Sequence, residues 1–270
     1  MAIICISRGS ATGGRALAHG LAEILGSALV SREDIVRRAA ENGVPVEELE
    51  HALRDPLSSL EKLGHRRAGY LAFVRLALCE RAMEDNIIYH GNAGHLLLDP
   101  RVRALRIRMV APLEHRARAL VEAEGISLQE ATARIEATDR QRRDWTRFLY
   151  GVDPLDPLLY DLVLNLHILG AQGAIEVATA AARRPEFELD DEAREVLADS
   201  LLACRVDAAL AAHKETAGVS VRVLAQRGVV SLTGRVPSPA QEEAVVRVAE
   251  SVEGVERLER DGLGSPNLLV

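Results

Sequence analysis

Aromatic side chains are scarce in this sequence: phenylalanine, tryptophan and tyrosine together make up 3% of its 270 residues. A surface that stacks the bases of single-stranded nucleic acid needs several exposed aromatic rings, so the shortage argues against such a partner. The formal net charge of −7 points the same way, because affinity for nucleic acid comes from clustered lysine and arginine. We therefore expect no nucleic-acid partner, and a core built from aliphatic residues.

Cysteine and long apolar runs are also rare. The three cysteines, Cys5, Cys79 and Cys204, lie far apart among apolar neighbours, which predicts buried reduced thiols with neither a disulfide framework nor a metal site. No apolar run reaches the ~18 residues that a membrane-spanning helix needs. The N-terminal residues show no basic region followed by a long apolar stretch and a cleavage site. We therefore expect a cytoplasmic protein without a transmembrane segment.

The beginning of the chain has the pattern of a strand, a glycine-rich loop and a helix. The apolar run 3–6 forms the strand. In the pattern of a phosphate-binding loop, Gly9 and Gly14 occupy the two glycine positions. Arg15 stands in the lysine position and Ala16 in the position of the serine or threonine. The match is partial, because Ala16 lacks the hydroxyl that normally holds magnesium.

This loop keeps much of the chemistry that binds phosphate. The small residues Gly9, Ser10, Gly13 and Gly14 let backbone N–H groups converge on an anion beside a helix N-terminus. The guanidinium of Arg15 can hold phosphate oxygens in a fork. A glycine loop between a strand and a helix can equally serve as a plain tight turn, and this alternative stays open.

Strand and helix patterns alternate over the next part of the chain, which predicts an α/β fold with a parallel sheet. Short apolar runs mark the strands, and apolar residues at helical spacing mark the helices. The further strands are expected at 28–30, 86–91, 105–110 and 160–165. The helices are expected at 16–25, 35–40, 66–85, 112–124, from Ser127 onward and at 173–184, with two short ones within 45–63.

The helix that begins at Ser127 becomes strongly basic toward its end. From periodicity alone, a charge run of this kind is the solvated face of a helix. Its arginines are Arg134, Arg140, Arg142, Arg143 and Arg147, interspersed with Asp139 and Asp144.

The composition changes at 185–194, a polar stretch broken by Pro185. It predicts a linker between a domain at 1–184 and a smaller one at 195–270. Strands joined through glycine and flanked by helices indicate an α+β unit in the second domain. We expect helices at 195–212 and 238–252, and strands at 219–223, 229–236 and 255–261.

Several short motifs occur in one order along the first domain. They are Ile6-Ser7-Arg8 with Gly13-Gly14-Arg15, Ser31-Arg32-Glu33, His90-Gly91-Asn92-Ala93, Ala111-Pro112-Leu113-Glu114-His115-Arg116, Asp139-Arg140-Gln141-Arg142-Arg143 and Tyr160-Asp161-Leu162-Val163-Leu164-Asn165. With them the chain resembles the cytidylate kinase-like family of P-loop proteins, from Ile3 to about Ala181. The resemblance implies a P-loop kinase-type parallel sheet flanked by helices, with a helical lid.

The same resemblance implies transfer of the γ-phosphoryl group of ATP, with Mg²⁺, to a nucleotide or similar small acceptor. It places Arg8, Gly9, Ser10, Gly13, Gly14, Arg15 and Ala16 at the ATP phosphates. It gives catalytic roles to Arg15, Arg140, Arg143 and Arg147, the last three as lid arginines. Arg32, Asn92 and His95 would line the acceptor pocket, although His95 also fits a plainer interpretation as a surface or capping residue.

Some positions depart from the family pattern. Asn92 replaces an arginine expected at the acceptor phosphate, and Ser31 replaces an aspartate near the same pocket. Together with Ala16, Asn92 favours a second hypothesis, a sensor that binds a nucleotide without turnover. The magnesium ligands are not located, and the candidates are Ser10, Thr12, Asp144 and Asp161.

The C-terminal domain has glycines at Gly228, Gly234 and Gly254, each next to a β-branched or basic strand residue. With these it resembles the BON domain, which implies an interaction or regulatory module with a lipid or protein partner. The glycines also fit a plain role as turn and bulge residues. A third hypothesis, an envelope lipid-binding protein, is disfavoured by the missing signal peptide. The sequence settles neither the acceptor nor the oligomeric state.

Overall fold

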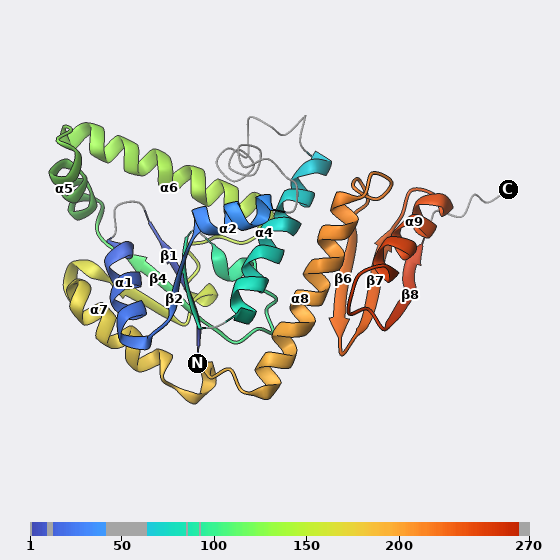
Figure 1. Ribbon diagram of the computed structural model, residues 1–270. Coiled ribbons are helices and arrows are strands. Elements are labelled where there is room, and N and C mark those ends of the chain that lie inside the picture. The colour runs from blue at the N-terminus through green and yellow to red at the C-terminus, as the bar shows by residue number, and fades with distance from the viewer. Residues whose placement is uncertain (1, 10–12, 42–63, 85, 92, 265–270) are drawn as a thin grey trace. The chain divides into compact units, whose positions relative to one another are not determined.

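The computed structural model describes residues 2–9, 13–41, 64–84, 86–91 and 93–264 (Figure 1). Its contacts group the chain into two compact units, each with one sheet. The first unit comprises Met1–Asp34 and Glu84–Leu189, and the second comprises Ile35–Met83 and Asp190–Val270. The second unit therefore combines residues from the middle of the chain with the C-terminal segment. The linear limits 1–184, 185–194 and 195–270 remain a prediction.

The first unit is built on a five-stranded parallel sheet with the order β2-β3-β1-β4-β5. Its central strand, β1, is buried along nearly its whole length because it has a neighbour on both sides. The expected parallel α/β fold is confirmed. The strands are β1 (Ile3–Arg8), β2 (Ala28–Ser31), β3 (Ile87–His90), β4 (Ala104–Val110) and β5 (Leu162–Asn165).

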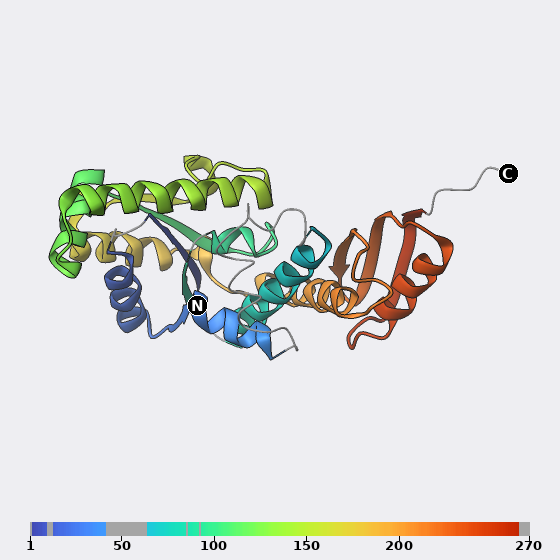
Figure 2. The ribbon, with the colours of Figure 1, turned by 90° about the horizontal axis from the view of Figure 1, so that it is seen from above.

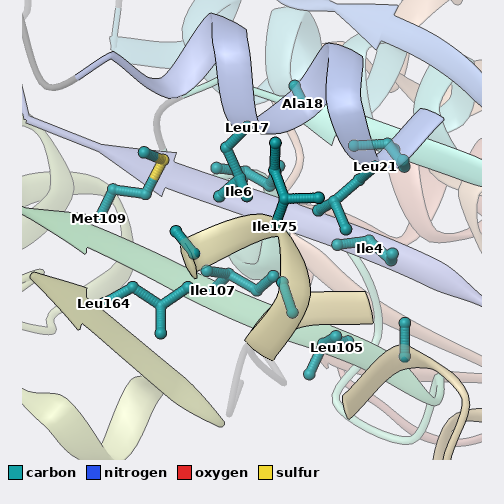
Figure 3. Packing of buried hydrophobic residues seen from close by; sticks show 14 of the residues in the cluster. Ile4, Ile6, Leu17, Ala18, Leu21, Leu105, Ile107, Met109, Leu164 and Ile175 are labelled. Atoms are coloured by element: carbon teal, nitrogen blue, oxygen red, sulfur yellow. The ribbon is translucent and has the colours of Figure 1, made fainter. Parts of the chain in front are cut away.

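Two helices cover one face of this sheet and form its main core (Figure 3). Helix α1 (Gly14–Leu25) contributes Leu17 and Leu21, and α7 (Leu166–Ala182) contributes Ile175. They pack onto side chains of β1, β4 and β5, for example Ile6 and Ile107. Burying each such Leu or Ile contributes about 1.5–3 kcal/mol, so this layer holds α1 against the sheet beside the end of β1.

A helical hairpin follows β4. Helices α5 (Leu113–Glu124) and α6 (Leu128–Tyr150) pack through a small apolar core of Ala117, Ala131 and Ile135. The Ser127 hydroxyl accepts a hydrogen bond from the Glu130 N–H and so caps α6, which confirms the expected start of this helix. Figure 2 shows α6 as a long light-green helix beside the sheet. We call α5 and α6 the lid hairpin.

The remaining elements of the first unit are short or lie next to the strands. They are the first residues of α2 (Arg32–Ala40) and the 3₁₀ turns at Gly94–Leu96, Pro157–Leu159 and Pro185–Phe187. The helix expected at 173–184 is present as the second part of α7, but α7 begins earlier, at Leu166, where the Asn165 side chain caps it. Gly170 then interrupts it with φ 65° and ψ 177°. The two short helices expected within 45–63 lie outside the described residues.

The second unit contains a three-stranded sheet with the order β6-β7-β8. Strands β6 and β7 are antiparallel and turn at Arg227 and Gly228, whose φ angles of 48° and 78° suit a tight hairpin. Strand β8 runs parallel to β7, after the crossover helix α9. The elements are α4 (Gly64–Glu84), α8 (Asp191–Ala212), β6 (Val221–Gln226), β7 (Val229–Arg235), α9 (Pro239–Glu250) and β8 (Arg257–Gly264).

The core of this sheet comes from α8 and α9, with Val206, Val230 and Val245 fully buried. This arrangement confirms the expected small α+β fold. Helix α8 begins at Asp191, earlier than the expected residue 195, because the Asp190 carboxylate accepts a hydrogen bond from the Ala193 N–H. Within the described residues, no helix combines the length and the apolar character that a membrane crossing requires.

Candidate functional site

The candidate site lies at the carboxyl ends of the parallel strands, where ligands bind in open α/β sheets. Strand β1 ends at Arg8, and the chain returns as α1 after a left-handed turn at Gly13, where φ is 74°. The N–H of Ala16 donates to the carbonyl of Gly13 at 3.0 Å, which closes the first turn of α1. Ser10 and Thr12, both named from the sequence, lie outside the described residues.

Gly14 is required by the close approach of Arg8. A Cβ atom at Gly14 would lie 2.4 Å from Cδ of Arg8 and 3.3 Å from Sδ of Met109. The missing side chain therefore lets Arg8 lie across the first residue of α1. This gives the second glycine of the loop a steric role beside its expected contact with phosphate.

A pocket of about 500 Å³ opens beside Gly9, between the end of β4 and the lid hairpin. Basic side chains dominate its charged lining, and the acidic ones are Glu136 and Asp139. The basic ones are Arg8, Arg108, Arg116, Arg140, Arg142 and Arg143. Asp139 is already paired with Arg116 at 2.6 Å, so most of this positive charge is not neutralised within the pocket.

Arg8 and Arg142 are adjacent, half-buried cations in this lining. Nη1 of Arg142 donates to the backbone carbonyl of Arg8 at 3.4 Å. Burial lowers the pKa of both guanidinium groups, and the neighbouring Arg8 lowers the pKa of Arg142 further. Among the described residues, no carboxylate forms an ion pair with Arg8, Arg140 or Arg142. Such a group of cations is suited to an anion with several negative charges.

Two of the expected lid arginines are held by one carboxylate. Arg143 donates to Asp153 through Nε at 3.0 Å and Nη2 at 2.5 Å, and Nη2 of Arg147 donates to it at 2.6 Å. The hydrogen bond from Arg143 is the main cause that holds the pKa of Asp153 well below its usual range. Arg143 also lines the pocket, whereas Arg147 does not.

The other predicted residues that the structure describes do not line this pocket. Arg15 is exposed at the start of α1, and Arg32 is partly buried at the start of α2. Gly13, Gly14 and Ala16 belong to the turn and first residues of α1. Asn92 lies outside the described residues.

His95 is not the exposed residue that the plainer interpretation expects. Its ring packs against Tyr160 with 4.9 Å between the centroids, and both ring nitrogens are buried without a hydrogen-bond partner. Burial lowers the pKa of His95 to about 4, so the ring is neutral at pH 7. The hydroxyl of Tyr160 lies 3.3 Å from Nη1 of the pocket-lining Arg108, so Tyr160 contacts both His95 and the pocket lining.

Two further residues belong to the candidate site, although the sequence analysis gave them no role there. His90 ends β3 next to Ile6 of β1, is 8% exposed, and keeps its Nδ1 buried without a partner. Burial and then Arg8 lower the pKa of His90, which favours the neutral form of its ring. The second of these residues is Arg142. The sequence signal that could have identified it is its position in the basic run of α6.

The described residues offer no clear set of protein ligands for magnesium. They contain no group of three or more His, Cys, Asp or Glu side chains arranged to hold a metal ion. Asp161, one sequence candidate, accepts bonds from Arg106 through both carboxylate oxygens at 2.7 and 3.1 Å. Asp144 is exposed on α6.

Comparisons with known proteins agree with this arrangement. The sequence profile of the cytidylate kinase-like family matches residues 3–168, and that of the BON domain matches residues 198–262. The chain belongs to the cytidylate kinase-like family. The family match covers the whole sheet of the first unit and the lid hairpin, so the glycine loop and the arginine-lined pocket both lie within the matched part of the chain.

Similar proteins include two cytidylate kinases. The one from Ignicoccus hospitalis is 31% identical over 180 residues, which cover 65% of this chain and 96% of that protein. The one from Methanopyrus kandleri is 33% identical over 173 residues, which cover 60% of this chain and 83% of that protein. A solved structure of an uncharacterised protein from Eubacterium ventriosum matches with a TM-score of 0.53 and 16% identity, over 67% of this chain and 97% of that one. This last likeness concerns the fold alone.

Proposed function

We propose that the protein transfers the γ-phosphoryl group of ATP to a nucleotide or a similar small acceptor. The observation that carries this proposal is a set of three arginines around one pocket beside the glycine loop, Arg8, Arg140 and Arg142, which form no ion pair with any carboxylate that the structure describes. Because like charges at close range destabilise the empty site, a ligand of high negative charge is the natural occupant. Relatives named cytidylate kinase support a nucleotide as that ligand.

The chemistry needs positioning and charge neutralisation more than covalent assistance. In this proposal the backbone at Gly9, Ser10, Gly13 and Gly14 binds the ATP phosphates, and Arg15 approaches the β- and γ-phosphates. Arg140 and Arg142 neutralise the charge that spreads over the transferring group. The remaining assignments are Arg143 and Arg147 as lid residues, and Arg32, Asn92 and His95 as acceptor contacts.

Magnesium would be held mainly by phosphate oxygens and water, because the pocket lining offers only two carboxylates, Glu136 and the already paired Asp139. When bound, it supplies further neutralisation of the polyphosphate. Ala16 brings no hydroxyl to this ion, so the arginines carry a larger share of the charge.

The test is a coupled assay with ATP, magnesium and a panel of nucleoside monophosphates. We expect formation of ADP that depends on one or more acceptors, and its loss in an Arg142→Ala variant. Tight binding of ATP without acceptor-dependent formation of ADP would contradict the proposed phosphoryl transfer. It would favour the second candidate, a nucleotide-binding sensor. Ala16, which lacks the magnesium-binding hydroxyl, is the observation that favours this candidate.

We further propose that residues 195–270 act as a ligand- or partner-binding module joined to the kinase-like domain at 1–184 by the segment 185–194. The match to the BON domain supports this division. Flotation with liposomes would test a lipid ligand: co-migration of the full chain with vesicles supports it, and a chain that stays in the soluble fraction contradicts it.

A further inference from the structure

Two of the three cysteines meet inside the second unit. Cys79 lies in α4 and Cys204 lies in α8, 125 residues later, with 3.5 Å between their Sγ atoms. Both side chains are buried, at 0% and 1% exposure. The Oγ atom of Ser200, one turn before Cys204, lies 3.7 Å from the Cys79 sulfur. The expectation of buried thiols is confirmed, but their separation in the sequence gave no sign of this contact.

An ion pair holds the two helices in register at this point. Nη1 of Arg75 lies 3.2 Å from Oδ2 of Asp207, about one helical turn from the two sulfur atoms. Arg75 precedes Cys79 whereas Asp207 follows Cys204, so the helices run antiparallel here. The pair of thiols is therefore fixed by two adjacent contacts between α4 and α8 and does not depend on a mobile loop.

We propose that Cys79 and Cys204 form an intramolecular disulfide when the protein meets a small-molecule disulfide as oxidant. A disulfide bond measures about 2.05 Å, so the sulfurs must approach by about 1.5 Å from their 3.5 Å contact. Rotation about the Cα–Cβ bonds and a small shift of the helices can supply this movement. The modification joins the part of the chain that matches the cytidylate kinase-like family to the part that matches the BON domain.

The reaction is two successive thiol–disulfide exchanges. One cysteine loses its proton and attacks the small disulfide, which releases one small thiol and leaves a mixed disulfide. The second cysteine then attacks this mixed disulfide, releases the second small thiol and forms the Sγ–Sγ bond. Both S–H bonds are broken, and the two electrons and two protons leave on the two small thiols.

Burial makes this reaction slow. The contact with Cys79 and desolvation raise the pKa of Cys204, so little thiolate is present at pH 7. The first exchange therefore requires a transient opening between α4 and α8. The product resists unfolding, because it closes a long loop of the chain. Cys5 is also buried, in β1, and serves as an internal control.

The test uses the full chain in native buffer with oxidised glutathione, followed by alkylation of the remaining thiols and peptide mapping. We expect a linked pair of peptides that contain Cys79 and Cys204 in the wild type and in a Cys5→Ser variant. We expect no such link in Cys79→Ser or Cys204→Ser, which stop at the mixed disulfide. The midpoint of thermal unfolding should rise by several degrees in the oxidised wild type and return with dithiothreitol.

Several outcomes would overturn the proposal. A link that forms only in urea would mean that the folded protein does not allow the reaction. A link to Cys5, or a disulfide between two chains, would mean that other thiols react first. An unfolding midpoint that oxidation leaves unchanged or lowers would mean that the bond does not fit the native contact. The peptide map of the wild type decides the first two without any variant.

Discussion

Arg142 carries a positive charge beside a second cation, Arg8, and forms no ion pair with a carboxylate in the described part of the chain. Burial and the neighbouring Arg8 lower its pKa, so the charged form is destabilised in the empty pocket. We expect Arg142→Ala to weaken ATP binding by about tenfold to a hundredfold, because one hydrogen bond to a charged group is lost. The thermal stability of the free protein should stay the same or rise, because a repulsion is removed. Calorimetric titration with ATP and thermal unfolding measure the two effects.

The matched control is Arg134→Ala, on the same helix α6. Arg134 pairs with Glu124, and its side chain is 55% exposed and outside the pocket lining. This variant should leave ATP affinity unchanged. An equal loss of affinity in both variants would show that α6 as a whole, and not the pocket charge, governs binding.

Asp207 predicts how stability depends on pH. Burial raises its pKa from 3.8 to about 6, although Arg75 opposes the shift. Between these two pKa values the folded state keeps a proton on Asp207 that the unfolded state has lost. The stabilisation that this proton provides is therefore full below pH 4 and disappears as the pH rises through 6. At pH 7 the charged Asp207 lowers the free energy of unfolding by at most roughly 3 kcal/mol. This is an upper limit, because 20% of the side chain is exposed and water screens part of the effect.

We expect Asp207→Asn to flatten the change in unfolding free energy between pH 5 and pH 7, measured by urea denaturation. The control is Glu215→Gln, a carboxylate of the same unit that is 57% exposed. If Asp207→Asn keeps the slope of the wild type, the titrating group lies elsewhere.

Side-chain pairings at this scale could be predicted only in part. The sequence identified Arg140 and Arg143, because a basic run in a helix is visible in one segment. It did not identify the approach of Arg142 to Arg8, which joins positions 134 residues apart. It also missed the pairing of Arg143 with Asp153, since Asp153 follows the helix end at Gly151 and periodicity does not predict the path of a loop.

At the scale of single elements, the start of α1 depends on Gly14. We expect Gly14→Ala to weaken ATP binding, because the new Cβ would lie 2.4 Å from Cδ of Arg8 and displace it. The helix itself tolerates alanine better than glycine, so the fold should persist. Gly173→Ala is the control, since its Cβ would meet Leu169 at an ordinary 3.6 Å. Calorimetric ATP titration and circular dichroism compare the two variants, and equal ATP affinity in both would contradict the steric role of Gly14.

The C-terminal end of α6 depends on Asp153. Because the pKa of Asp153 is depressed in the folded state, its carboxylate stabilises the fold at pH values above the unfolded-state pKa. This stabilisation is lost as the pH falls below about 4. We expect Asp153→Asn to release Arg143 and Arg147, and to speed hydrogen exchange of the last turn of α6 at neutral pH. Asp144→Asn, an exposed change on the same helix, should not do so. Equal exchange in both variants would mean that Gly151 and packing alone end the helix.

The elements themselves follow largely from the sequence. The expected strands of the first sheet all occur within a few residues of their limits, because buried parallel strands are apolar runs bounded by glycine and polar residues. Helix starts were less predictable. The caps by Asn165 and Asp190 lie several residues before the apolar periodicity begins, so α7 and α8 start earlier than their patterns indicate.

At the scale of the whole molecule, the sequence predicts two domains in succession, whereas the contacts place α4 and α8 in one unit. Local patterns cannot reveal such a pairing, because Arg75 with Asp207 and Cys79 with Cys204 are brought together only by the fold. A chain that ends after Leu189 therefore keeps the family sheet but removes α8 from α4.

Truncation after Leu189 is thus expected to expose Cys79, which is fully buried beside Cys204 in the full chain. We expect this thiol to react with a chromogenic disulfide reagent within minutes in the truncated chain, and the midpoint of thermal unfolding to fall. The full chain provides the protected reference, and Cys79→Ser in the truncated chain identifies the reacting group. If Cys79 stays protected and the midpoint is unchanged, residues 1–184 form an independent domain and α4 does not need α8. If the thiol reacts, the BON-like segment supports the folding of the kinase-like sequence as well as any ligand of its own.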